Sequence, residues 1–397
     1  MLPKRYLRAI LCASILAAIL ACRAAGQTNA MSVSEPFLIN HNRIFVEMEF
    51  VRPDGTSRKA LAFVDSGDPG FEFMQPLARE LGIERGRGVR ARFGRMDLKI
   101  PANIETSSEQ GETMFAGMKV EANLPARVLA QYDVALDYGK RTLTLGPPGS
   151  LKHEGVQVPC AVNATTGLIS IRARVAGQEH AFAIDNGSAY TWIDDAITRR
   201  WAESNPGWLR GIGAVGDANM NGALPELAGM DMRLPEIDTG SLHLEEVGAL
   251  GVGPGWDKTM PRFFNWYSKK TPAPVAGFLG GNVLRAFRIE IDYANHATYW
   301  SREGEVDPHD LDQVGITIGS APGGKYIVIG LATRNGTNAV KGVEVNDQLL
   351  SVDGVATTGA TMGRVLNALH GRPGEKRKLL LERGGKQFVV DAPVTRF

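Results

Sequence analysis

Cysteine is scarce in this 397-residue chain, which contains only three. Cys12 and Cys22 lie near the start, and Cys160 stands alone in the rest of the sequence. A disulfide framework is therefore excluded, and the seven histidines lack the paired spacing of a metal site. The sequence predicts no metal and no cofactor, and Cys160 is expected to be a small buried apolar residue.

An excess of charge of either sign is also missing. The chain has 44 lysines and arginines against 43 aspartates and glutamates, so its charge gives no reason to expect nucleic acid as a partner. The apolar run at residues 9–21 is too short to span a bilayer. It follows Lys4, Arg5 and Arg8 and precedes small residues, which is typical of a secretory signal. We therefore predict export, with residues 1–26 as the signal peptide.

The end of this signal has two interpretations. Ile19-Leu20-Ala21-Cys22 resembles a bacterial lipobox, in which Cys22 is lipidated and becomes the mature N-terminus. Cleavage near Gly26 is the alternative. Both place the protein in a bacterial envelope, either in the periplasm or as a lipoprotein with a lipid anchor at Cys22.

Glycine, by contrast, is abundant, with 46 residues, and short alternating apolar segments recur between turns. These features favour a mainly β fold. One pattern occurs twice: residues 60–64 lead into Asp65-Ser66-Gly67, and residues 181–184 lead into Asp185-Asn186-Gly187, 120 residues later. One Asp-x-Gly after a strand is common in turns, but two copies after matching strands indicate a duplicated unit.

A second pair of segments supports the duplication. Residues 128–138 align without a gap on residues 283–293, so Asp137 corresponds to Asp292. These segments are 155 residues apart, so the second copy contains roughly 35 additional residues after its acid. We predict two homologous lobes, at 33–148 and 156–302.

These motifs resemble the retropepsin-like aspartic proteases of bacteria. The resemblance covers about residues 40–300. It rests on the two Asp-x-Gly loops, on residues 277–284 and on the two strands that contain Asp137 and Asp292. It implies that each lobe supplies one aspartate, Asp65 and Asp185, and that the pair shares a water molecule at the lobe interface. The supporting loop residues would be Ser66, Gly67, Asn186, Gly187 and Ser188, with glycine permitting the tight turns.

The sequence departs from the family pattern at three places. Asn186 replaces the usual serine or threonine, although an amide can also donate a hydrogen bond. Asp68 adds a negative charge beside the first motif, and residues 123–126 lack the glycines found at 278–281. Two functions therefore remain open. One is an aspartic endopeptidase, and the other is an inactive peptide-binding or scaffold protein of the envelope.

Asp238-Thr239-Gly240 is a better literal match to the family signature than the second motif. Its flanks are typical of two strands joined by a turn, and it lies only 39 residues before Gly277. That distance is too short for the rest of a lobe. We predict a hairpin turn without a catalytic role.

Two further segments of the second copy have two interpretations each. Residues 211–217 are glycine-rich and lie where the family places a flap over its cleft, but an ordinary hairpin fits equally well. The aromatic residues 263–267 would either form apolar subsites for a peptide or pack the larger lobe.

The composition changes after a charged linker predicted at residues 301–312. The apolar residues Met362, Val365, Leu366 and Leu369 follow helical spacing and predict a helix. Together with residues 342–354, this helix resembles part of a bacterial PDZ domain that would cover residues 313–397. The resemblance implies that a peptide C-terminus binds by strand addition. The expected groove residues are Gly323, Gly324, Tyr326, Ile327, Val328 and Val365.

The alternative for this segment is a degenerate groove that only packs within the chain. The whole prediction is a mainly β protein with two retropepsin-like lobes and an α+β PDZ domain. Its expected substrate is a peptide or an unfolded protein.

Overall fold

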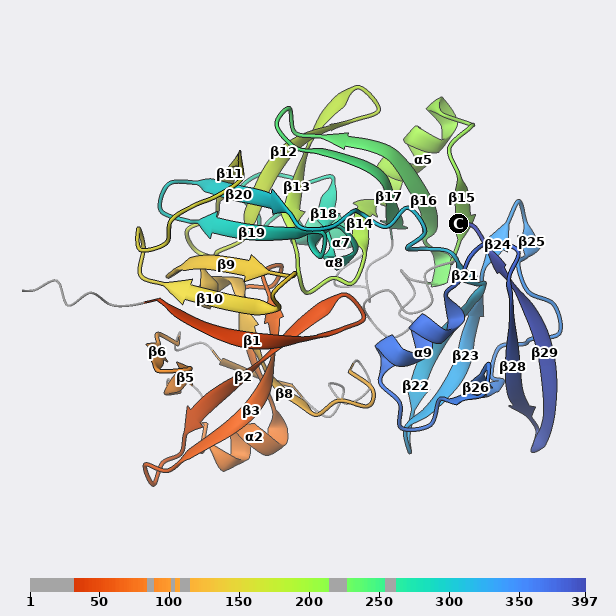
Figure 1. Cartoon of the computed structure of the whole chain (residues 1–397), viewed down its shortest axis with the longest axis horizontal. Helices are drawn as coiled ribbons and strands as arrows, with labels where there is room; N and C mark the ends of the chain where they lie inside the picture. Colours follow the sequence, from red (N-terminus) through yellow and green to blue (C-terminus); the bar gives the residue numbers. More distant parts are fainter. Residues whose placement is uncertain (1–31, 84–88, 101–103, 108–114, 214–226, 254–261) are drawn as a thin grey trace, which may run out of the picture.

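The computed structural model describes residues 32–83, 89–100, 104–107, 115–213, 227–253 and 262–397. The predicted signal peptide and Cys22 lie outside these residues. Strands dominate the described chain, which confirms the prediction of a mainly β protein (Figure 1). Within the described residues, no helix has the length and apolar character needed to cross a membrane.

The first strands form an antiparallel meander of β1 (Val33–Asn40), β2 (Arg43–Val51) and β3 (Ser57–Asp65). Only His41 and Asn42 connect β1 to β2, with φ angles of 50° and 60°. Two positive φ angles are typical of a type I′ hairpin turn, whose twist matches that of the flanking strands. This tight turn fixes the position of Arg43 at the start of β2.

A parallel strand then crosses beside β3. The pairing joins β3 to β8 (Val120–Pro125), so the end of β3 at Asp65 lies beside Pro125, and α4 (Ala126–Leu129) follows at once. The other elements of this segment are β4 (Phe71–Met74), α2 (Gln75–Glu80), β5 (Ala91–Phe93), β6 (Met96–Leu98), β7 (Ile104–Ser107), β9 (Asp133–Asp137) and β10 (Thr142–Gly146).

The same local arrangement occurs around the second motif. Strands β12 (Ile169–Val175) and β13 (Gln178–Ile184) are antiparallel, and β13 pairs in parallel with β18 (Gly277–Leu279), which α8 (Gly281–Leu284) follows. The remaining elements are β11 (Val156–Val162), β14 (Thr191–Asp194), α5 (Asp195–Ser204), β15 (Arg210–Ile212), β16 (Met230–Asp238), β17 (His243–Val252), α7 (Phe263–Tyr267), β19 (Phe287–Asp292) and β20 (Ala297–Arg302).

Strands β9 and β19 join the first segment (residues 33–146) to the second segment (residues 156–302). Strand β9 pairs antiparallel with β19, with Asp137 opposite Arg288, and the sheet runs in the order β1-β10-β9-β19-β20-β11. Figure 1 shows this sheet between the first and second segments. Buried side chains of both segments form one continuous apolar cluster. The shared sheet and core therefore fix the two aspartate loops relative to each other.

Residues 313–397 form a separate sheet in the order β21-β29-β28-β26-β23-β22, with β27 paired to β26. Helix α9 (Met362–Leu369) lies at the position predicted from the apolar spacing, and the Thr361 side chain caps its start. The strands of this sheet are β21 (Gln313–Val314), β22 (Ile316–Ala321), β23 (Lys325–Leu331), β26 (Gln348–Val352), β27 (Val355–Ala356), β28 (Lys376–Arg383) and β29 (Lys386–Thr395). Strands β24 (Thr333–Arg334) and β25 (Thr337–Asn338) pair with each other and join the larger sheet, in which β24 pairs with β15.

This C-terminal segment packs closely on the first segment. The backbone N–H of Met362 donates to Ala116 O at 3.2 Å, and Gly363 N donates to Asn40 Oδ1 at 3.1 Å. A methyl group on Gly363 would lie 2.4 Å from Asn40 Oδ1, so the start of α9 requires glycine there. Helix α9 is therefore seated directly against the β1–β2 turn.

The segment predicted as a linker is partly buried. Leu311 and Asp312 are completely buried, and the buried Asp310 accepts a hydrogen bond from Arg233 at 3.0 Å. An exposed spacer would leave these side chains in water. Residues 310–312 thus attach the C-terminal sheet to β16 rather than letting it move freely.

Candidate active site

The two predicted acids lie together, each against the glycine of the other loop. A methyl group on Gly67 would lie 2.1 Å from Cγ of Asp185, and one on Gly187 would lie 2.4 Å from Cγ of Asp65. No side chain larger than hydrogen fits at either position unless the opposite carboxylate moves. Both carboxylates therefore occupy the same small space between the ends of β3 and β13.

Ser66 and Asn186 lock the two loops to each other through reciprocal hydrogen bonds. Ser66 Oγ donates to Ile184 O at 3.0 Å and accepts from Asn186 N at 3.1 Å. In return, Asn186 Nδ2 donates to Val64 O at 2.8 Å, and Asn186 Oδ1 accepts from Ser66 N at 2.9 Å. The amide of Asn186 thus makes the same pair of backbone contacts as the hydroxyl of Ser66.

Backbone N–H groups orient both carboxylates. Gly67 N donates to Asp65 Oδ1 at 2.9 Å, and Gly187 N donates to Asp185 Oδ1 at 2.9 Å. Asp185 Oδ1 also accepts from Ser188 N at 3.0 Å. The Ser188 hydroxyl donates to Tyr190 O, so the second loop continues as a hydrogen-bonded turn.

Burial and nearby negative charges favour the protonated forms of this pair. Burial raises the pKa of Asp185 to about 6, although the N–H groups of Ser188 and Gly187 partly offset the effect. Burial, then the nearby charges of Asp185 and Asp68, raise the pKa of Asp65 well above its ordinary value. The pair therefore retains a proton at pH values where an exposed aspartate is ionised.

The aromatic helix α7 packs inside the second segment. Phe263, Phe264 and Tyr267 are buried, and the Tyr267 ring lies 5.7 Å from the ring of Phe278 on β18. Burial, then the carboxylates of Asp185, Asp65 and Asp68, raise the pKa of Tyr267 well above its ordinary value. The side chains therefore serve mainly in packing, but α7 lies within electrostatic range of the acid pair.

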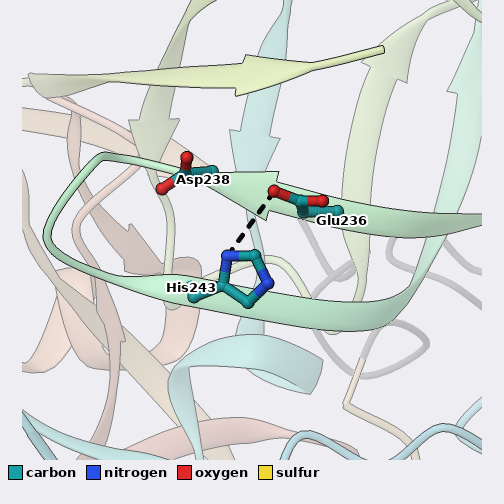
Figure 2. Close-up of side chains that lie close together, drawn as sticks. All are labelled: Glu236, Asp238 and His243. Atoms are coloured by element: carbon teal, nitrogen blue, oxygen red, sulfur yellow. Dashed lines mark ion pairs between the residues drawn. The ribbon is translucent and has the colours of Figure 1, made fainter. Parts of the chain in front are cut away.

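Asp238 lies on the predicted hairpin turn, away from the acid pair's loops. It ends β16 opposite His243 of β17, and its Oδ1 accepts from Gly240 N at 2.7 Å. Figure 2 shows Asp238 beside Glu236 and His243, whose carboxylate and ring nitrogen are 3.5 Å apart. These three side chains are near enough to share a metal ion, but Glu236 and His243 are exposed and hydrogen bonds or ion pairs within the hairpin already involve all three.

The expected peptide groove on β23 needs correction. Tyr326, Ile327 and Val328 lie on β23, which pairs with β22 along one edge and with β26 along the other. A strand with both edges paired cannot accept a further peptide strand. Gly323 and Gly324 form the β22–β23 turn, with φ angles of 79° and 69°, and Val365 is buried in α9.

Two further predictions concern the glycine-rich residues 211–217 and Cys160. Gly211 lies on β15, which pairs with β16 and β24, whereas residues 214–217 of the expected flap lie outside the described residues. Cys160 is buried as expected, and burial raises the pKa of its thiol to about 12. That thiol is accordingly a packing group rather than a nucleophile.

One contact on the acid loops had no signal in the sequence. Arg43 Nε donates to Gly187 O at 3.1 Å, and the neighbouring Asn42 Nδ2 donates to Ala189 O at 3.1 Å. Arg43 begins an ordinary alternating strand, and nothing in the neighbouring sequence reveals that the β1–β2 turn reaches the second segment. Only the three-dimensional arrangement brings this guanidinium to the Asp185 loop.

No protein-family model matches this sequence, and no curated protein matches it. Among solved structures, the photosystem II D1 C-terminal processing protease is 18% identical, with a TM-score of 0.19. The match covers 22% of this chain and 23% of that chain. A likeness this slight carries no inference about fold or function.

Proposed function

We propose that this chain is an exported aspartic-type endopeptidase whose catalytic residues are Asp65 and Asp185. The observation that carries the proposal is the reciprocal packing of each carboxylate against the glycine of the opposite loop. It is the arrangement expected of two homologous retropepsin-like lobes, each of which contributes one acid. The interlocking contacts of Ser66 and Asn186 support it, because the asparagine fills both hydrogen-bonding roles of a serine or threonine.

The proposed chemistry follows from one proton shared between two buried acids. The ionised carboxylate removes a proton from a water molecule, and the water oxygen attacks the carbonyl carbon of the peptide bond. The protonated carboxyl gives its proton to the carbonyl oxygen, which yields a neutral tetrahedral intermediate. The raised pKa of both acids keeps this singly protonated state populated from acidic pH toward neutrality.

For residues 313–397 we propose a PDZ domain that binds peptide C-termini. The groove is assigned to β22 instead of β23, because β22 is the last strand in the described order of its sheet. Ile318 of β22 and Val365 of α9 belong to one buried cluster, which supports a groove between this strand and the helix. Peptides with a free C-terminal carboxylate are expected to bind the purified protein, and matched peptides with an amidated C-terminus are not.

The proposed location is the bacterial envelope, with a lipid anchor if Cys22 is modified. Substitution Cys22→Ser separates the two forms of the mature protein. Loss of membrane association in the Cys22→Ser variant supports the lipoprotein, whereas unchanged association rules out lipidation at this residue.

Peptide hydrolysis by the purified mature protein tests the catalytic proposal. Asp65→Asn and Asp185→Asn are each expected to abolish cleavage of a peptide library from acidic to neutral pH, because base and acid have different roles. Asp238→Asn is the matched control and should cleave like the wild type. Hydrolysis that survives in either single variant would exclude the shared-water mechanism. A wild-type protein inactive at every pH would instead favour the envelope scaffold.

A further inference from the structure

The two acid loops differ in one buried cation. In the first segment, Phe45 pairs with Phe63, two residues before Asp65. In the second, Ser170 pairs with Ala183, two residues before Asp185. This register makes Leu168 the counterpart of Arg43, and both side chains are buried. The Asp185 loop therefore receives an arginine from the opposite segment, and the Asp65 loop receives none at the equivalent position.

The Arg43 side chain is held in place by its surroundings. Arg43 is only 3% exposed, its guanidinium lies 6.0 Å from the centroid of the Phe115 ring, and its Nε donates to Gly187 O. The adjacent Asn42 is fixed in turn by Arg285, whose Nη1 donates to Asn42 Oδ1 at 2.8 Å. A buried guanidinium fixed to the carbonyl two residues after Asp185 acts on that carboxylate with little screening by water.

Among the residues that the structure describes, the other charged or titratable groups near the pair do not provide this cation. Asp68 and Asp65 are acids, and Tyr138 and Tyr267 are buried phenols whose pKa is raised first by burial and then by Asp185. Burial, then Arg43, then His370 lower the pKa of His41 well below its ordinary value, so this ring is uncharged at neutral pH. The positive charge acting on Asp185 therefore comes from Arg43.

We propose that Arg43 is a positioning residue of the acid pair, which holds the Asp185 loop and makes Asp185 the ionised member while the shared proton stays on Asp65. In this arrangement Asp185 accepts the proton of the water and Asp65 donates to the carbonyl oxygen. The negative charge of Asp68 raises the pKa of both acids, and the uncharged Ser188 occupies the matching place after Asp185. The inference rests on the proposed aspartic-protease activity.

The pH profile of kcat/KM tests this role. Its acidic limb reports the ionisation of the base, so Arg43→Met and Arg43→Gln should move that limb upward by about half to one pH unit. Arg43→Lys keeps the charge and should restore the limb to within about 0.3 unit. Arg302→Met is the matched control, because Arg302 also donates to a carbonyl, His243 O, and lies 5.0 Å from a phenylalanine ring. It should leave the profile unchanged.

A second readout separates this inference from the proposed activity. In protein with ¹³C-labelled aspartate, the Asp185 carboxyl signal, assigned with Asp185→Asn, should titrate at lower pH than that of Asp65. Arg43→Gln should raise the Asp185 midpoint, and this holds even if the wild type cleaves no peptide. The proposal is wrong if folded Arg43→Gln or Arg43→Met leaves both the Asp185 titration midpoint and the acidic limb of the kcat/KM profile unchanged. A loss of kcat by the same factor at every pH would also overturn it.

Discussion

The Asp65 loop and the Asp185 loop have equivalent backbone contacts and unequal electrical surroundings. Each carboxylate accepts the N–H of the glycine two residues later, and each loop bonds to the backbone of the other. Asp68 lies beside the first acid, whereas Ser188 and the Arg43 guanidinium lie beside the second. Backbone equivalence brings the acids together, and the unequal side chains give them different electrostatic environments.

The largest expected effect comes from replacing the two glycines that allow each loop to pack against the opposite carboxylate. Gly67→Ala and Gly187→Ala would each place a methyl group within 2.4 Å of the opposite carboxylate carbon, so the pair must move apart. Displacement of reacting groups by about 1 Å costs on the order of 100-fold in rate, and peptide hydrolysis should fall by at least about that factor in both variants. Steady-state assays measure this loss.

Gly207→Ala is the control for this pair of substitutions. Apart from its two chain neighbours, no heavy atom of the described residues lies within 4 Å of a methyl group at Gly207, so this variant should retain full activity. Normal hydrolysis in Gly67→Ala together with loss in Gly187→Ala would show that the loops do not pack reciprocally.

The interlock between the loops should have the next largest effect, on stability. Asn186→Ala leaves Ser66 N and Val64 O without their partners, and Ser66→Ala does the same to Asn186 N and Ile184 O. Each orphaned buried group costs about 1–3 kcal/mol, so either variant should lose about 2–6 kcal/mol of unfolding free energy. Urea unfolding at neutral pH measures the loss.

Asn186→Thr sharpens this comparison. A threonine hydroxyl can accept from Ser66 N and donate to Val64 O, so its unfolding free energy should lie within about 1 kcal/mol of the wild type, with activity preserved or raised. A loss in Asn186→Thr as large as in Asn186→Ala would mean that the amide has a role that a hydroxyl cannot fill.

The pH dependence of stability should show the burial of the pair. Because the pKa of Asp185 rises from 3.8 to about 6 on folding, its protonated form favours folding below about pH 4, and this contribution disappears as pH rises through 6. The asparagine of Asp185→Asn does not ionise, so this variant does not lose stability when the pH rises. It should be more stable than wild type at pH 7 by about 1–3 kcal/mol and nearly equal to it at pH 4.

Asp65→Asn should follow the same course, because burial and then the charges of Asp185 and Asp68 raise the pKa of Asp65 well above its ordinary value. Urea unfolding at both pH values provides the measurement. Parallel pH dependence in the wild type and both variants would show that the acids are not buried together in solution.

The sequence predicted that Asp65 and Asp185 lie together, but not which residues surround them. Asp65 and Asp185 were found because each follows an apolar strand and carries its own glycine, which are local signals that repeat at fixed spacing. The contact of Arg43 depends on a two-residue turn meeting a loop 144 positions away, and no local pattern encodes that meeting.

The prediction of the C-terminal groove was also limited by contacts between distant segments. The apolar spacing of Met362, Val365, Leu366 and Leu369 correctly predicted α9, because helical periodicity is local. It did not reveal that β26 occupies the second edge of β23, since strand order in a sheet is set by pairing between distant segments. The element was predicted correctly, and its neighbours were not.

The smallest expected effect concerns Asp68 and isolates charge from shape. Asp68 Oδ1 accepts from Gly70 N at 2.9 Å, and the amide oxygen of Asp68→Asn can keep that bond, so the substitution removes mainly a negative charge. That charge raises the pKa of both acids, and its loss should move both limbs of the kcat/KM profile to lower pH by a few tenths of a unit. Ser188→Ala, which changes no charge at the matching position of the second loop, should leave both limbs in place. Limbs that stay in place in folded Asp68→Asn would mean that the Asp68 charge does not act on the acid pair.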